Sequence, residues 1–254
     1  MTPNKPSQPV QGVTDKRMAT TINKQRLLTQ LFHAMKKAVE LDDEARPVLQ
    51  QFIYGLCREN TTREKADEAY QFLCEKFFDW NEVRVSSLRE LEEAFDGRND
   101  AEQRAQRLIS FLQEVFEIHF AFDLDKLLKE GLKQAAKKLA RYQAANDYVV
   151  SWVTQRSLEG HAIPVDAPTL RCARRLGLLE GEPDEAEARA SLEHLVPKAK
   201  GPLFTDCISA VAGEYCWEEN PHCSACPLVN ECAHAQELGV EALAPSRSHR
   251  AKPR

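Results

Sequence analysis

The chain has 254 residues, of which 43% are apolar, 29% charged and 7% aromatic. This composition is typical of a soluble globular protein and excludes a collagen-like, a wholly disordered or a membrane-spanning chain. The formal net charge is −5, and the negative excess lies in the body of the chain because both tails are basic. Binding of nucleic acid by bulk charge is therefore excluded, and any such contact must be local.

Both ends of the chain differ in character from its body. Three prolines and scattered polar residues in residues 1–20 predict a disordered tail, and residues 236–254 predict a basic one. No apolar run has the length of a bilayer span or the form of a signal peptide. We therefore expect a cytoplasmic protein, in which the eight cysteines are buried thiols or metal ligands rather than disulfides.

The body of the chain has the pattern of long helices. No proline occurs between Pro47 and Pro164, and apolar residues recur at helical spacing. They include Leu27, Leu28, Leu31, Phe32, Met35 and Val39, and then Leu108, Ile109, Leu112, Val115 and Phe116. Thr61 with Glu64, and Ser87 with Glu90, have the spacing of capping boxes. Because period-2 segments are absent, we expect an all-α fold of eight to ten helices.

Four cysteines near the carboxyl end predict a metal centre. Cys216, Cys223, Cys226 and Cys232 form the pattern C-x6-C-x2-C-x5-C within 17 residues. Four thiols so close together favour a 4Fe–4S cluster or a structural zinc, and zinc sites more often contain two C-x2-C pairs. The other cysteines lie at apolar helical positions and are expected to be buried; they are Cys57, Cys74, Cys172 and Cys207.

This cysteine spacing resembles that of the endonuclease III branch of the helix-hairpin-helix DNA glycosylases. The segments Phe204–Cys207 and Gly213–Cys216 resemble the helix that leads into the family's cluster. Ile163–Arg171 resembles its Val-Asp-Thr-His-x-x-Arg segment, so that the likeness extends over about residues 45–235. The resemblance favours a 4Fe–4S cluster on the four cysteines.

The resemblance implies a fold of two helical domains with a cleft at Asp166. Residues 46–165 would form one domain with a degenerate hairpin, and residues 21–45 with 166–235 would form the iron–sulfur domain. Family members flip a damaged base out of duplex DNA and break its N-glycosidic bond. Asp166 would be the catalytic carboxylate that stabilises positive charge on the sugar. Its simpler role, compatible with the first, is to cap a helix that begins near Pro168.

The sequence departs from the family at the hairpin. Ala145 stands where bifunctional members carry the lysine that forms a Schiff base, so lyase activity is not expected. The family's Leu-Pro-Gly-x-Gly, whose amides point at a DNA phosphate, corresponds to Leu139–Gln143, which contains no glycine. A basic stripe is expected instead on one helix, opposite Leu127, Leu128, Leu132 and Leu139, with Lys133, Lys137 and Arg141 as candidate DNA contacts; its members are Lys126, Lys129, Lys133, Lys137 and Arg141. The alternative is a solvated outer face.

The loop between the first two cluster cysteines is a further departure. In relatives this loop is basic, whereas Trp217–His222 here contains two glutamates, which predicts weak binding of double-stranded DNA. Two functions follow for what we expect to be a monomer without a membrane contact. The first is a monofunctional base-excision repair glycosylase. The second is a catalytically inactive iron–sulfur protein that uses the scaffold for binding or redox partnering.

Overall fold

The computed structural model describes residues 23–36, 39 and 44–242. The tail predicted for residues 1–20 lies outside the described residues, as do residues 243–254 of the predicted basic tail. The described part of the chain contains twelve α-helices and no β-strand, which confirms the all-α prediction. None of its helices is long and apolar enough to cross a bilayer.

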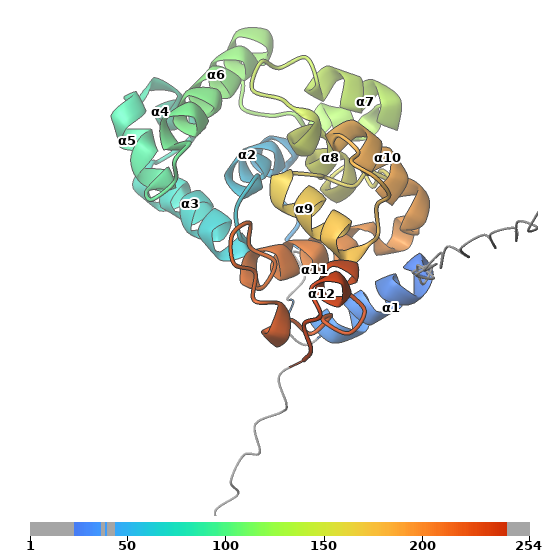
Figure 1. Ribbon diagram of the computed structural model, residues 1–254. Helices are drawn as coiled ribbons and strands as arrows, with labels where there is room; N and C mark the ends of the chain where they lie inside the picture. Colours follow the sequence, from blue (N-terminus) through green and yellow to red (C-terminus); the bar gives the residue numbers. More distant parts are fainter. Residues whose placement is uncertain (1–22, 37–38, 40–43, 243–254) are drawn as a thin grey trace, which may run out of the picture.

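The helices form two groups, one from the middle of the chain and one from its two ends (Figure 1). The first group is α2 (Val48–Arg58), α3 (Arg63–Lys76), α4 (Trp80–Val85), α5 (Leu88–Glu92), α6 (Ala101–His119), α7 (Leu132–Leu139) and α8 (Asp147–Arg156). The second group is α1 (Lys24–Met35), α9 (Ala167–Leu176), α10 (Glu185–Leu195), α11 (Gly201–Glu214) and α12 (Ala233–Glu237). Each group encloses its own apolar core.

The predicted number of helices, eight to ten, was too low for the described residues. Three of the twelve helices, α4, α5 and α12, have six residues or fewer, and such short helices show too few apolar repeats to be recognised. The capping box of Ser87 and Glu90 at α5 is confirmed. The other prediction was wrong by one residue, because Thr62 and not Thr61 caps α3 by accepting the Lys65 N–H.

Helix α2 lies at the centre of the first group, between α3, α6 and α8 (Figure 1). Phe52 of α2 stacks on Phe111 of α6 with ring centroids 3.8 Å apart. Almost one turn further along α2, Gly55 allows α8 to approach closely, because a Cβ there would lie 3.2 Å from Cδ1 of the buried Trp152. Burial of α2 on all sides fixes the position of its carboxyl end, from which the loop at Glu59 begins.

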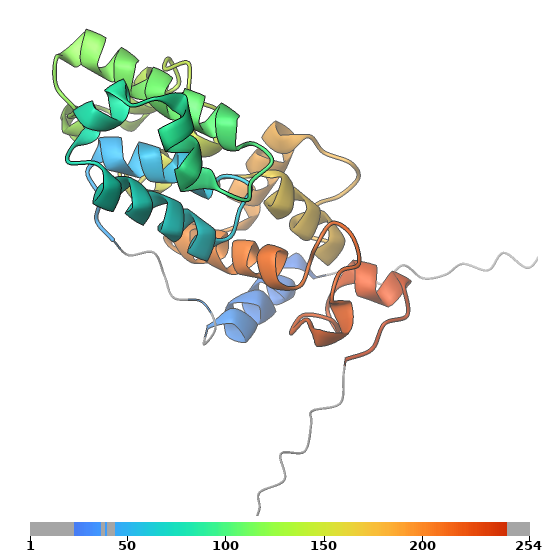
Figure 2. The same ribbon diagram turned by 90° about the vertical axis from the view of Figure 1, so that its left-hand side faces the viewer.

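The second group joins the two ends of the described chain. Helix α1 packs against α11, although the two are far apart in sequence (Figure 2), and Leu31 and Phe204 are both fully buried there. The prediction of buried thiols is confirmed for Cys57, Cys172 and Cys207 but wrong for Cys74, which is exposed. Cys74 lies on α3 beside Gln71 and Glu75, which are exposed as well.

Candidate active site

Asp166 is the N-cap of α9, as the sequence predicts. Its Oδ1 accepts the backbone N–H of Thr169 at 3.0 Å, and proline occupies the first turn of the helix. This is the usual bond by which an aspartate satisfies a free amide at a helix start. Only 6% of Asp166 is exposed, so the carboxylate lies where water screens its charge weakly.

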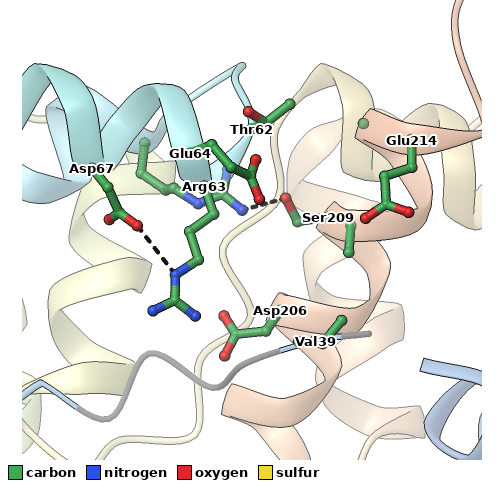
Figure 3. Close-up of a pocket in the computed structure, with 11 residues that line it drawn as sticks. Val39, Thr62, Arg63, Glu64, Asp67, Asp206, Ser209 and Glu214 are labelled. Atoms are coloured by element: carbon green, nitrogen blue, oxygen red, sulfur yellow. Dashed lines mark hydrogen bonds and ion pairs between the residues drawn. The ribbon is translucent and has the colours of Figure 1, made fainter. Parts of the chain in front are cut away.

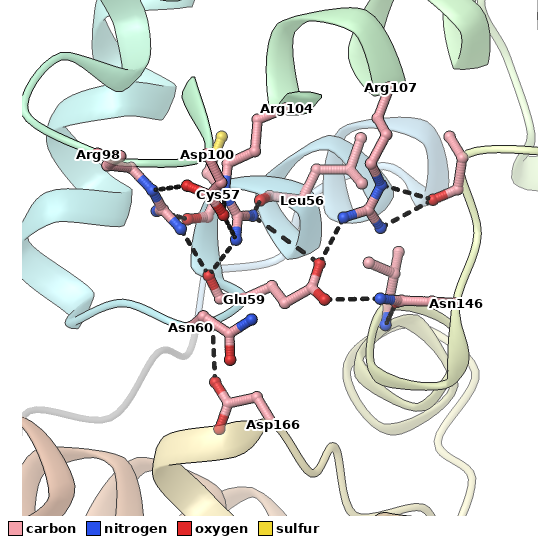
Figure 4. A network of polar contacts seen from close by, with 12 residues as sticks. Leu56, Cys57, Glu59, Asn60, Arg98, Asp100, Arg104, Arg107, Asn146 and Asp166 are labelled. Carbon is pink, nitrogen blue, oxygen red and sulfur yellow. Dashed lines mark hydrogen bonds and ion pairs between the residues drawn. The ribbon is translucent and has the colours of Figure 1, made fainter. Parts of the chain in front are cut away.

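The second oxygen of Asp166 is bound by a loop of the other helix group (Figure 4). The N–H of Asn60, which follows α2, donates to Oδ2 at 2.9 Å. In return the Asn60 side-chain oxygen accepts the N–H of Ala167 at 3.2 Å. Asn60 has φ +53°, a left-handed conformation that asparagine tolerates better than most residues. The two bonds therefore join the end of α2 to the start of α9.

The side chain of Glu59, the neighbour of Asn60, contacts α6 and the start of α8 instead of Asp166. Its carboxylate accepts Nδ2 of Asn146 at 2.6 Å and a guanidinium nitrogen of Arg107 at 2.8 Å. Its backbone carbonyl accepts Arg98 at 2.9 Å and Arg104 at 2.8 Å. Sequence reasoning assigned nothing to this segment. The loop is thus held from both sides, by α6 and by the start of α8.

The start of α8 completes the surroundings of Asp166. Burial, followed by the negative charge of Asp166, raises the pKa of Tyr148, whose ring stacks on Trp152 with centroids 6.3 Å apart. Asp147 forms an ion pair with Arg189 of α10 at 2.9 Å. Burial and then the charge of Asp166 raise the pKa of Glu185 at the start of α10. The amino ends of α8 and α10 therefore lie near Asp166, at the amino end of α9.

The predicted hairpin is present as two helices, α7 and α8, joined by residues 140–146. No residue from 131 to 146 has a positive φ, so the left-handed amide nest of a glycine-rich turn is not formed. The N–H of Gln143 instead donates to Oε2 of Glu114 at 3.0 Å, and Arg107 donates to the carbonyl of Ala144 at 2.9 Å. The turn is thereby bound to α6.

The candidate DNA contacts lie on the surface at this hairpin. Lys133 and Lys137 are exposed on α7, and Arg141 is exposed in the turn that follows it. The prediction of one continuous basic stripe was wrong. Lys126 and Lys129 belong to a separate 3-10 helix, Asp125–Lys129, because Gly131 with ψ 138° is extended and begins a new helix. The apolar row opposite is broken too, since Leu128 and Leu132 are exposed.

The four clustered cysteines line one cavity, and Cys172 of α9 lines the same cavity. Arg175 of α9 donates to Sγ of Cys216 at 3.8 Å, and Arg171 donates to its carbonyl at 2.9 Å. Burial raises the pKa of Cys226 to about 11. Among the described residues, no three histidine, cysteine or acidic side chains converge on a point where a single metal ion could bind.

The loop between the first two of these cysteines is acidic and exposed, as the sequence indicates. Glu218 and Glu219 face solvent, while the guanidinium of Arg175 holds the backbone carbonyls of Trp217 and Glu218. Helix α9 therefore carries Asp166 at its start and supports the cysteine loop at its end.

A separate cavity of about 310 Å³ opens between the start of α3 and α11 (Figure 3). Four carboxylates line it, together with two arginines that bond to neighbouring groups: Arg63 to Asp67 at 3.3 Å and Arg58 to Ser209. Asp166 does not line this cavity. A surface with so many acids is unsuited to a phosphate backbone.

Comparison with known sequences finds distant relatives, and no family model matches the chain. The DNA glycosylase/AP lyase ROS1 of Arabidopsis thaliana is 24% identical over 173 residues, covering 61% of this chain and 12% of that protein. The transcriptional activator DEMETER of the same plant is 25% identical over 173 residues, covering 61% and 9%. The chain thus spans only a small fraction of the length of these curated relatives.

Comparison with solved structures identifies the fold. A non-covalent endonuclease III–DNA complex matches with a TM-score of 0.66 and 16% identity, covering 85% of this chain and 98% of that one. A thermostable thymine-DNA glycosylase matches with a TM-score of 0.62 and 16% identity, covering 84% and 97%. The chain therefore has the fold of endonuclease III.

Proposed function

We propose that this protein is a DNA N-glycosylase that hydrolyses the N-glycosidic bond of a damaged or mispaired base in duplex DNA. The observation that carries the proposal is the buried carboxylate of Asp166, which lies at the start of α9 between the two helix groups. The fold of endonuclease III, in which this carboxylate is set, supports the same conclusion. Because one fold can host several functions, the proposal depends on the carboxylate and not on the fold.

Asp166 would act by electrostatic stabilisation. When the bond from C1′ to the base nitrogen breaks, the electron pair leaves with the base and the sugar becomes positively charged. A water oxygen then adds to C1′ and loses a proton to solvent, and the nitrogen of the released base takes up a proton, so that the products are a free base and a sugar with a hydroxyl at C1′. A carboxylate that two backbone amides already orient needs no reorganisation as this charge develops, and weak screening by water increases its effect.

The reaction would stop after base release. A lyase step requires an amine that forms a Schiff base with the sugar, and Ala145 supplies none. The nearest lysine before it, Lys138, forms an ion pair with Glu130 at 2.5 Å. We therefore propose a monofunctional enzyme whose product is an abasic site in an intact strand.

Contact with DNA would come from side chains at the hairpin. Lys133, Lys137 and Arg141 are exposed on α7 and the turn after it, where they can contact phosphates without reading the sequence. Because the turn offers no amide nest and the cysteine loop is acidic, binding of double-stranded DNA would be weak and strongly dependent on salt.

The four clustered cysteines would hold a 4Fe–4S cluster. Their sulfurs border one shared cavity, as ligands that each bind a different iron of a cube would. A zinc site needs all four sulfurs on one ion. When bound, the cluster would stabilise the fold of residues 216–232 against α9 and α11. We assign the ligands to Cys216, Cys223, Cys226 and Cys232.

A panel of duplexes with oxidised, deaminated or mismatched bases tests the proposal. The wild-type protein should release a free base from at least one duplex under single-turnover conditions, and Asp166→Asn should be slower by roughly 100-fold or more. Equal rates would remove Asp166 from catalysis. An iron-containing protein that releases no base from any duplex would instead be an inactive scaffold.

A further inference from the structure

We propose that Asn60 is a positioning residue for Asp166, and that the dipeptide Glu59-Asn60 links the hairpin to the candidate catalytic carboxylate. This inference rests on the proposed function. The observation behind it is the reciprocal pair of bonds between the loop after α2 and the first residues of α9 (Figure 4).

The contact fixes both the carboxylate and the helix end. Asn60 N–H to Oδ2 and Thr169 N–H to Oδ1 bind the two oxygens of Asp166 from different directions. With one donor on each oxygen, the plane of the carboxyl group is set as well as its position. The Asn60 side chain meanwhile accepts the otherwise free N–H of Ala167, one of the unpaired amides at a helix start.

Asn60 can make this contact only while its loop keeps an uncommon backbone conformation. The φ of +53° at Asn60 costs free energy for a residue with a side chain. Arg98 and Arg104 hold the preceding carbonyl, and 2% of Arg104 is exposed. Arg104 is in turn bound to Asp100 at 2.8 Å. A buried, fully bonded arginine therefore supports the strained residue.

The same loop also contacts the end of the hairpin. Asn146 caps α8 through its side-chain oxygen, which accepts the N–H of Val149 at 3.0 Å, and its amide nitrogen bonds to Glu59 at 2.6 Å. A hydrogen bond from Asn146 to Glu59, the peptide bond from Glu59 to Asn60 and a hydrogen bond from Asn60 to Asp166 thus form a continuous path. It places the start of α8, which follows the turn that carries the exposed Arg141, in fixed relation to the carboxylate.

Asn60→Gly tests the role. Glycine keeps the backbone donor and accepts the left-handed φ, but it loses the bond to Ala167 and frees the loop. We expect base release under single-turnover conditions to slow roughly tenfold, which corresponds to about 1.4 kcal/mol of transition-state stabilisation, with the Kd for duplex DNA within about twofold. Glu159→Gly is the matched control, because Glu159 is exposed with φ +51° and lies outside this path.

A double-mutant cycle separates positioning from a general effect on the fold. In an Asp166→Asn background, Asn60→Gly should have little further effect, because the group that it positions has already lost its charge. The same tenfold loss in that background, or a rate for Asn60→Gly within twofold of the wild type, would overturn the proposal.

Amide hydrogen exchange provides a measurement that needs no activity. Asp166→Ser keeps a residue that caps α9 well, but its short side chain cannot reach the Asn60 N–H. Exchange at Asn60 should be slow in the wild type and much faster in Asp166→Ser, and unchanged exchange would overturn the contact. If no duplex releases a base at all, the proposed function fails, and this exchange result alone decides whether Asn60 holds Asp166.

Discussion

Glu114 on α6 accepts the backbone N–H of Gln143 in the hairpin turn, with 3.0 Å between Oε2 and the amide nitrogen. Gln143 corresponds to the second glycine of the hairpin in the family that this chain resembles, where an amide points at a DNA phosphate. Here the Glu114 carboxylate of the protein itself accepts the N–H of that amide. The negative charge of Glu114, after burial, also raises the pKa of the neighbouring Tyr142 to about 12, so the carboxylate lies close to the turn.

Neutralising Glu114 should strengthen DNA binding. Glu114→Gln removes a negative charge beside the turn but keeps an oxygen that accepts the Gln143 N–H. We expect the affinity for duplex DNA to rise about threefold at low salt, since a single partly exposed charge contributes less than about 1 kcal/mol. Fluorescence anisotropy with a labelled duplex measures this. Glu117→Gln, an exposed change on the same helix, should give a smaller increase, and equal increases would mean that only net charge matters.

Introducing a lysine at position 145 should restore covalent chemistry. Ala145 is half-buried directly before the N-cap of α8, so Ala145→Lys places an amine at the end of the hairpin turn. With a duplex that the wild type processes, borohydride should trap a protein–DNA adduct for Ala145→Lys and none for the wild type. Trapping with the wild-type protein would show that another amine reaches the sugar. Lys138→Ala would then identify or exclude the nearest one.

The buried arginine of α6 should contribute strongly to stability. Arg104 donates to Asp100 and to the carbonyls of Leu56 and Glu59. Arg104→Ala removes the side-chain donor to the Leu56 carbonyl, and it leaves Asp100 and the Glu59 carbonyl with Arg98 as their remaining donor. We expect the free energy of unfolding to fall by about 2–3 kcal/mol. Lys24→Ala breaks a more exposed ion pair with Glu180 and should cost less than about 1 kcal/mol. Urea unfolding of both variants measures the difference, and similar losses would contradict it.

The same cluster predicts a loss of stability in acid. Burial of Asp100 opposes its charge, but hydrogen bonds from Arg104 and Arg98 hold its pKa below the usual 3.8. A lowered pKa in the folded state contributes stability above the unfolded value, and this contribution is lost as the pH falls through the folded value. The melting temperature should therefore decline below about pH 4. Asp100→Asn should melt lower at neutral pH and show a shallower decline, and parallel curves would exclude Asp100.

The features that the sequence predicted correctly are mostly local. The helical class, the Ser87–Glu90 box and the cap at Asp166 each depend on residues within one or two turns. The Asn60 contact joins residues 106 positions apart, and Asn60 lies in no periodic element, so no pattern could reveal it. The prediction of one continuous basic stripe was wrong for a related reason. Its spacing was helical, but Gly131 separates two helices, and periodicity alone does not detect such a break.

Five thiols border one cavity, and we propose that four of them bind the cluster and one does not. Cys172 comes from α9, whereas Cys216, Cys223, Cys226 and Cys232 belong to the C-x6-C-x2-C-x5-C pattern. Because a 4Fe–4S cluster uses one thiolate for each iron, Cys223→Ser should lose most of its iron and acid-labile sulfide, while Cys172→Ala should keep both. Iron removal by a chelator should lower the melting temperature of the wild type and of Cys172→Ala alike. Loss of iron from Cys172→Ala with full retention in Cys223→Ser would reverse the assignment, and stoichiometric zinc without sulfide would replace the cluster by a single ion.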